Sequence, residues 1–76
     1  MDKETLALVI AQNGLGSAQT LIQIKAATLQ KQADAEQNAA AKKKLLARMR
    51  KAQKLAAALK AADTGLAEYL AEASAL

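Results

Sequence analysis

The residues of this chain that could do chemistry are mostly basic, and they gather in one stretch. Residues 40–62 contain eight lysines and arginines and no acidic residue. These are Lys42, Lys43, Lys44, Arg48, Arg50, Lys51, Lys54 and Lys60. Clustered cations neutralise phosphates, so this stretch could bind DNA or RNA independently of base sequence, with an affinity that falls steeply as salt rises.

The same charges have a second interpretation. A basic helix face can keep an alanine-rich bundle in solution, or it can pair with acidic residues of a neighbouring subunit. Tyr69 is the only aromatic residue, so the chain lacks the side chains on which single-stranded bases usually stack. It also lacks the Trp and Phe anchors of helices that lie on anionic bilayers. Both interpretations of the basic stretch remain open.

The sequence contains few of the residue types on which enzyme catalysis usually depends. There is no His and no Cys, so one chain cannot build a His-assisted nucleophile, a thiolate or an imidazole ligand. Ser17 is better explained as a helix cap, and Glu68 with Glu72 suits a solvated acidic face better than a cation site. We therefore expect no enzymatic activity, no cofactor and no metal site.

The composition predicts an all-α protein. There is no Pro, there are only three Gly, and Ala, Leu, Lys and Gln, all good helix formers, are abundant. β-Branched residues are few and do not alternate with polar residues, so no strand is expected.

The predicted core is thin. Hydrophobic residues make up 53% of the 76 residues, but 21 of them are alanine, which buries little apolar area. Without Cys, neither a disulfide nor a zinc site of the usual kind can reinforce a single small domain. We therefore expect the chain to pack against copies of itself or against other subunits rather than to stand as an independent globule.

Two apolar seams follow helical spacing. The first consists of Leu45, Met49, Ala52, Ala56 and Leu59. The second consists of Ile22, Ala26, Leu29 and Ala33. On one ideal helix the two seams differ by roughly 140° in direction, so either one long helix faces different neighbours or it breaks near Gln37-Asn38. The lack of Pro and Gly between residues 18 and 62 favours the continuous helix.

Residues that typically end or cap helices lie before and after the long helix, and they predict two shorter helices. Gly14 can end a helix over residues 3–12 in the left-handed C′ position, and Ser17 can cap the next helix. Asp63-Thr64-Gly65 separates a last helix over residues 66–74. The expected layout is an apolar N-terminal arm (1–16), a long helix with a basic face (17–62) and an acidic C-terminal helix (63–76).

The acidic tail and the basic helix are expected to meet between subunits. The tail surface consists of Leu66, Glu68, Tyr69, Leu70 and Glu72. The surface for an acidic partner or a nucleic acid consists of Lys43, Lys44, Arg50, Lys51 and Lys54. A nine- or ten-residue tail that folded back in its own chain would meet Leu55 and Leu59 first, so the contact is predicted to be with a neighbour.

Residues 5–24 carry no charge and match a bilayer in length. Several polar residues interrupt the segment and Asn13-Gly14 lies at its middle, so we expect it to bury itself in an assembly rather than to span a membrane. The N-terminus lacks the basic-then-apolar layout of a signal peptide, and synthesis in the cytoplasm is expected.

An uncharged N-terminus with Gly and Ala, followed by a helix rich in Gln, Ala and Lys, resembles small internal or connector-type virion proteins of tailed phages. The resemblance is one of composition over about residues 5–55 and transfers no site. The sequence thus predicts a non-enzymatic structural subunit of a ring, tube or shell, with sequence-independent nucleic-acid binding by residues 42–60 as the alternative.

Overall fold

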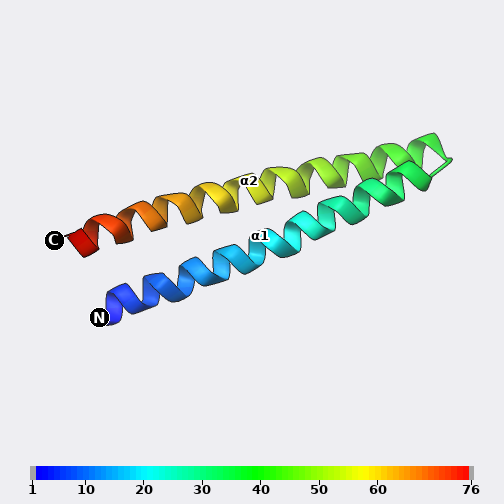
Figure 1. The fold of residues 1–76 in the computed structure, drawn as a ribbon. Helices are drawn as coiled ribbons and strands as arrows, with labels where there is room; N and C mark the ends of the chain where they lie inside the picture. The colour runs from blue at the N-terminus through cyan, green and yellow to red at the C-terminus, as the bar shows by residue number, and fades with distance from the viewer. Residues whose placement is uncertain (1, 76) are drawn as a thin grey trace.

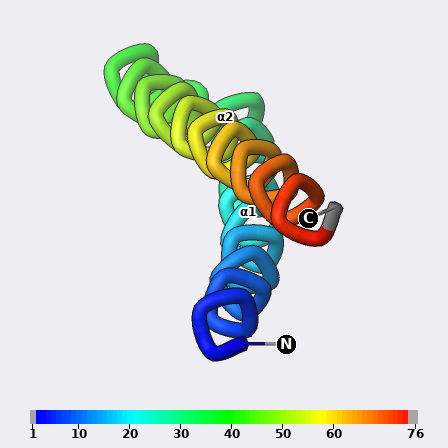
Figure 2. The backbone as a smooth tube through the Cα atoms, turned by 90° about the vertical axis from the view of Figure 1, so that its left-hand side faces the viewer, coloured from blue at the N-terminus to red at the C-terminus, as the bar shows by residue number. Residues whose placement is uncertain are grey.

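The computed structural model describes residues 2–75 and contains two long helices. Helix α1 spans Lys3–Ala35 and helix α2 spans Ala39–Ala75. The helices lie side by side and antiparallel, so both ends of the chain are at one end of a rod whose Cα atoms extend over 57 × 14 × 13 Å (Figure 1). Seen along the rod, the two helices cross (Figure 2). The predicted all-α class is confirmed for the residues that the structure describes.

Helix α1 begins at a side-chain cap. Asp2 has an extended backbone, and its carboxylate accepts a hydrogen bond of 2.7 Å from the Thr5 backbone N–H. This hydrogen bond lowers the pKa of the Asp2 carboxyl, because it stabilises the charged form. An ionised cap also suits the positive end of the helix dipole, to which Glu4 in the first turn adds a second negative charge.

Glu36, Gln37 and Asn38 reverse the chain. The Glu36 backbone N–H donates to the Ala33 carbonyl at 3.2 Å, which closes the last turn of α1. Asn38 then opens α2, because its side-chain oxygen accepts from the Ala41 backbone N–H at 3.1 Å. The Asn38 N–H in turn donates to the Glu36 carboxylate at 3.0 Å. Local hydrogen bonds of Glu36 and Asn38 therefore stabilise this three-residue turn.

The structure does not have the predicted layout of one long helix between two short helices. Gly14 lies inside α1 and Gly65 inside α2, and no glycine in residues 2–75 has a positive φ. A glycine within a helix costs only about 1 kcal/mol relative to alanine, and packing of the flanking turns against the other helix offsets that cost. Ser17 lies within α1, and Asp63, instead of capping a new helix, accepts a hydrogen bond of 3.3 Å from the Gln19 side chain.

The expected continuous helix over residues 18–62 is also absent. Of the two possibilities that the sequence left open, the structure has the break near Gln37-Asn38. The physical reason is that a chain that doubles back at this point can bury its two apolar seams against each other. A straight helix would leave both seams in water unless other subunits covered them.

Each helix turns a heptad-spaced seam toward the other, with steps of four and three residues. In α1 the seam residues are Leu8, Gln12, Leu15, Gln19, Ile22, Ala26, Leu29 and Ala33. In α2 they are Leu45, Met49, Ala52, Ala56, Leu59, Asp63, Leu66 and Leu70. All of them are buried or half-buried. This spacing of 3.5 residues is typical of helices that wind around each other, which agrees with the crossing in Figure 2.

Burial is concentrated near the turn. The buried residues are Ala26, Leu29, Ala33 and Met49, of which Ala33 is completely inaccessible. Toward the termini the seam includes Gln12, and the Gln19–Asp63 hydrogen bond takes the place of an apolar contact. The half of the rod next to the turn therefore holds the core.

The turn generates the first prediction. Asn38→Ala should lower the free energy of unfolding by about 1 kcal/mol, because the first turn of α2 loses its side-chain acceptor. Urea denaturation followed by circular dichroism measures this change. Gln37→Ala, at the exposed neighbouring position, is the matched control and should change the free energy by less than about 0.5 kcal/mol. Equal effects of the two substitutions would contradict the assignment of Asn38 as the cap.

Candidate functional site

The two predicted seams meet inside one chain. Ala26, Leu29 and Met49 form the core cluster, and the partly buried residues packed against it are Leu45, Leu46 and Ala52. Ala33 is buried near the turn, and the remaining seam residues, Ile22, Ala56 and Leu59, are half-buried. The structure thus places all nine predicted packing residues between α1 and α2, so these residues hold the hairpin together.

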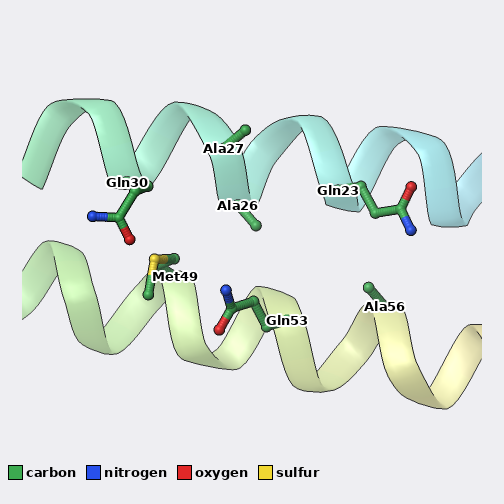
Figure 3. Close-up of a pocket in the computed structure, with 7 residues that line it drawn as sticks. All are labelled: Gln23, Ala26, Ala27, Gln30, Met49, Gln53 and Ala56. Carbon is green, nitrogen blue, oxygen red and sulfur yellow. The ribbon is translucent and has the colours of Figure 1, made fainter.

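A groove of about 410 Å³ opens along this seam. Ala26 from α1 and Ala56 from α2 are too small to fill the space between the helices, and Met49 fills only part of it (Figure 3). The other lining residues are Gln23, Ala27, Gln30 and Gln53. The lining carries no formal charge and no nucleophile. The groove is therefore a consequence of pairing small side chains and suits no particular reaction.

The basic residues face outward. Five basic side chains of α2 are all exposed: Lys43, Lys44, Arg50, Lys51 and Lys54. At about 100° per residue they lie more than 90° around the helix from the seam, so they share its outer side. Lys42, Arg48 and Lys60 are exposed as well. This surface, which we call the basic face, is available for contact with an acidic partner.

The predicted tail surface is divided between the two sides of α2. Leu66 and Leu70 are half-buried on the seam toward α1, whereas Glu68 and Glu72 are exposed. Tyr69 is 53% exposed. Because residues 63–75 continue α2, this surface is the terminal part of a long helix and not a separate element.

The hairpin separates charge along its length. Residues 25–54, which flank the turn, carry nine basic and two acidic residues, a net charge of +7. The rest of the chain carries two basic and five acidic residues, a net charge of −3. The acidic residues near both termini come together because the chain doubles back. This polarity was not predicted from the sequence, because a helix that continued through residues 36–38 would keep the two ends of the chain apart.

Large apolar side chains are exposed on α1. Leu6, Ile10, Leu21 and Ile24 are 50–68% exposed. They lie within the uncharged residues 5–24, which were predicted to be buried in an assembly, but the analysis of the sequence singled out none of the four. Their spacing was the available signal, because all four fall on the side of α1 that faces away from α2.

Other kinds of site find no support in the structure. Within residues 2–75 no group of three His, Cys, Asp or Glu side chains is placed to hold a metal ion. Neither of the two described helices combines the length and the apolar character needed to cross a bilayer. Comparison with protein-family models, with curated proteins and with solved structures found no match for this chain.

The seam generates the second prediction. Leu29→Ala should lower the free energy of unfolding by about 2–5 kcal/mol, because Leu29 is buried between the helices and its truncation leaves a cavity. Leu55→Ala is the matched control and should cause less than half of that loss, since Leu55 is already 47% exposed. Urea denaturation measures both changes. A Leu29→Ala variant as stable as the control would show that the helices do not pack through this seam.

Proposed function

We propose that this protein is a non-enzymatic structural subunit of a larger helical assembly, such as a ring, a tube or a shell. One observation carries the proposal: large apolar residues are exposed on a rod whose core is small. Among residues 2–74 four are buried, whereas the large side chains of Leu6, Ile10, Leu21, Ile24, Leu55 and Tyr69 are 47–68% exposed. Extended apolar patches of this kind are typical of protein interaction surfaces.

The energetics favour a covered surface. The buried residues include two alanines, and no large side chain among residues 2–74 is fully buried. A single core in a chain of this size contributes little net stability once the entropy of ordering is subtracted. Because these Leu and Ile side chains on α1 are 50–68% exposed, covering the rest of one of them would contribute about 1–2 kcal/mol. Association would therefore supply stability that the hairpin lacks.

Charge would set the register between subunits. Glu68 and Glu72 are exposed at one end of the rod, and the basic face lies toward the other end. A neighbour shifted or reversed along the rod would bring these opposite charges together. Exposed ion pairs contribute only about 0–1 kcal/mol each, so apolar contacts would supply the affinity and charges the specificity. The compositional resemblance to small virion proteins of tailed phages agrees with such a role.

Assembly is the third prediction. Sedimentation and native mass spectrometry should detect species larger than the monomer, and helical content by circular dichroism should rise with protein concentration. Raising the salt concentration should change these species little, because apolar burial supplies most of the affinity. A helical monomer with properties independent of concentration, and without a partner in the intact source material, would overturn the proposal.

The basic face supports a second candidate function, which is sequence-independent binding of DNA or RNA. Its eight cations are all exposed, and most of the acidic residues lie in the other half of the rod. A rigid helix that carries this many cations could track several phosphates at once. The chain offers no aromatic platform for unstacked bases in this region, so the binding would be electrostatic.

The fourth prediction concerns this second function. Affinity for mixed-sequence duplex DNA should fall by roughly 10³–10⁵ between 50 and 200 mM salt if six to ten phosphates are contacted. Replacing Lys43, Lys44, Arg50, Lys51 and Lys54 together by Gln should abolish retention in a gel-shift assay. Replacing Lys3, Lys25 and Lys31 of α1 by Gln is the control and should leave most of the binding intact. If neither DNA nor RNA is retained at 50 mM salt, the nucleic-acid function is contradicted and the basic face would contact a protein partner instead.

A further inference from the structure

The exposed side of α1 carries a continuous stripe that the hairpin itself does not use. Its members are Leu6, Ile10, Gly14, Ser17, Leu21, Ile24 and Thr28, which we call the outer stripe. All seven are exposed. Ile24, for example, is two residues from both Ile22 and Ala26 on the seam, which places it about 200° around the helix from each. The outer stripe therefore faces away from α2.

Gly14 on this stripe has no role within the hairpin. A Cβ atom built at Gly14 meets nothing within 4 Å, and the backbone φ is not positive. Within a helix, alanine at this position would be more favourable than glycine. A glycine that neither the backbone nor a neighbour in the chain requires leaves a gap in the outer stripe, and a side chain from outside the chain could fill it.

The outer stripe is complementary to itself when reversed. If two copies of α1 run antiparallel so that facing residue numbers sum to 34 or 35, Ile10 faces Ile24 of the second copy and Leu21 faces Gly14. At the centre Ser17 faces Ser17, where the two hydroxyls can hydrogen-bond to each other. A two-fold axis requires this kind of self-complementary surface. Large residues then lie opposite small ones at Leu21 and Gly14, and apolar residues lie opposite each other at Ile10 and Ile24.

The polar atom at the end of the stripe is already satisfied. The Thr28 hydroxyl donates to the Ile24 carbonyl at 3.0 Å, so covering Thr28 leaves this hydroxyl with its partner. In the same register Leu6 of the second copy faces Thr28. No formal charge lies between residues 5 and 24 to oppose burial.

Charge decides between antiparallel and parallel pairing. The antiparallel pair places residues 25–54 of one copy, with a net charge of +7, at the same end of the unit as the chain termini of the other copy, outside whose residues 25–54 the net charge is −3. It also brings Lys31, one helical turn beyond Thr28, opposite residues 2–4 of the second copy, where Asp2, Lys3 and Glu4 together carry a net charge of −1. A parallel pair would put both segments of net charge +7 at the same end of the unit and would leave Gly14 opposite Gly14. Like charges side by side are unfavourable, and this selects the antiparallel arrangement.

We propose that two copies of this chain associate antiparallel through the outer stripe of α1, with Leu21 of each copy packed over Gly14 of the other. This inference rests on the proposed assembly function and names the partner as a second copy. The resulting unit has four helices, with the two copies of α1 in the centre and the two copies of α2, with their basic faces, outside.

Cysteine cross-linking tests this arrangement, because the chain has no cysteine of its own. Ile10→Cys and Ile24→Cys are prepared as single variants of the full chain, mixed, and oxidised gently. Facing positions can form a disulfide only when their Cα atoms approach to about 4.4–6.8 Å. The mixture should give at least tenfold more disulfide-linked dimer than either variant alone. Leu55→Cys mixed with Ile24→Cys, a pair that includes an exposed position of α2 outside the outer stripe, is the control and should give little.

A pair of glycine variants tests the packing directly. Gly14→Leu should weaken association at least tenfold in sedimentation equilibrium, because the new side chain collides with Leu21 of the second copy. Gly65→Leu is the matched control, since Gly65 is also helical and open to solvent, and it should leave the association constant within about twofold. Equal association by the two variants would overturn the packing of Leu21 over Gly14.

The remaining outcomes separate this inference from the proposed function. Efficient dimers of Ile10→Cys alone and of Ile24→Cys alone would show parallel pairing and overturn the antiparallel one. Oligomers in sedimentation without the Ile10–Ile24 cross-link would overturn the pairing and leave the structural role standing. A purely monomeric chain would overturn the self-pairing, and a different protein would then be the partner of the outer stripe.

Discussion

The structure depends on one contact, the apolar seam between α1 and α2. Small side chains define it: Ala26 and Ala33 are buried beside Leu29 and Met49. Small residues let two helices approach closely, but they remove little apolar surface from water. The hairpin is therefore narrow and long, with a core limited to the half next to the turn. A groove remains where Ala26 and Ala56 leave space between the helices.

The reversal of the chain at residues 36–38 determines where the charged and the exposed apolar residues lie on the surface. It brings acidic residues near both termini to one end of the rod and keeps the basic residues around the turn. It also directs one side of α1 inward and leaves the uncharged opposite side in water. Residues 2–75 contain no third element that covers that side, and Leu21 and Ile24 remain exposed. The polarity of the charge and the apolar stripe are both consequences of the same turn.

These features are compatible with the proposed role as a structural subunit. The hairpin presents an apolar surface on α1 and a basic surface on α2, on opposite sides of the rod. One can be covered by another protein while the other remains free. Structural association and electrostatic binding of a nucleic acid would then use different helices, and both can occur in the same assembly.

The sequence alone determined the class of structure and the residues that pack. Helix-forming composition excluded strands, and the spacing of Leu45 and Met49 predicted which side of the second half would be apolar. The difference of roughly 140° between the two seams was also visible, and it is compatible with a hairpin, because a turn removes the fixed angular relation between residues on either side of it. The lack of His and Cys restricted the available chemistry in the same direct way, because residue types alone decide it.

Only the tertiary structure decided where the helices end and what the seams face. Gly14 and Gly65 were strong local signals for helix ends, yet both lie within helices, because packing along the whole rod outweighs about 1 kcal/mol of local preference. Asn38, a weaker signal, is where α2 begins, because a turn at this point lets the two seams bury each other. Local preferences are small beside the burial of a seam, and that burial depends on residues distant in the sequence.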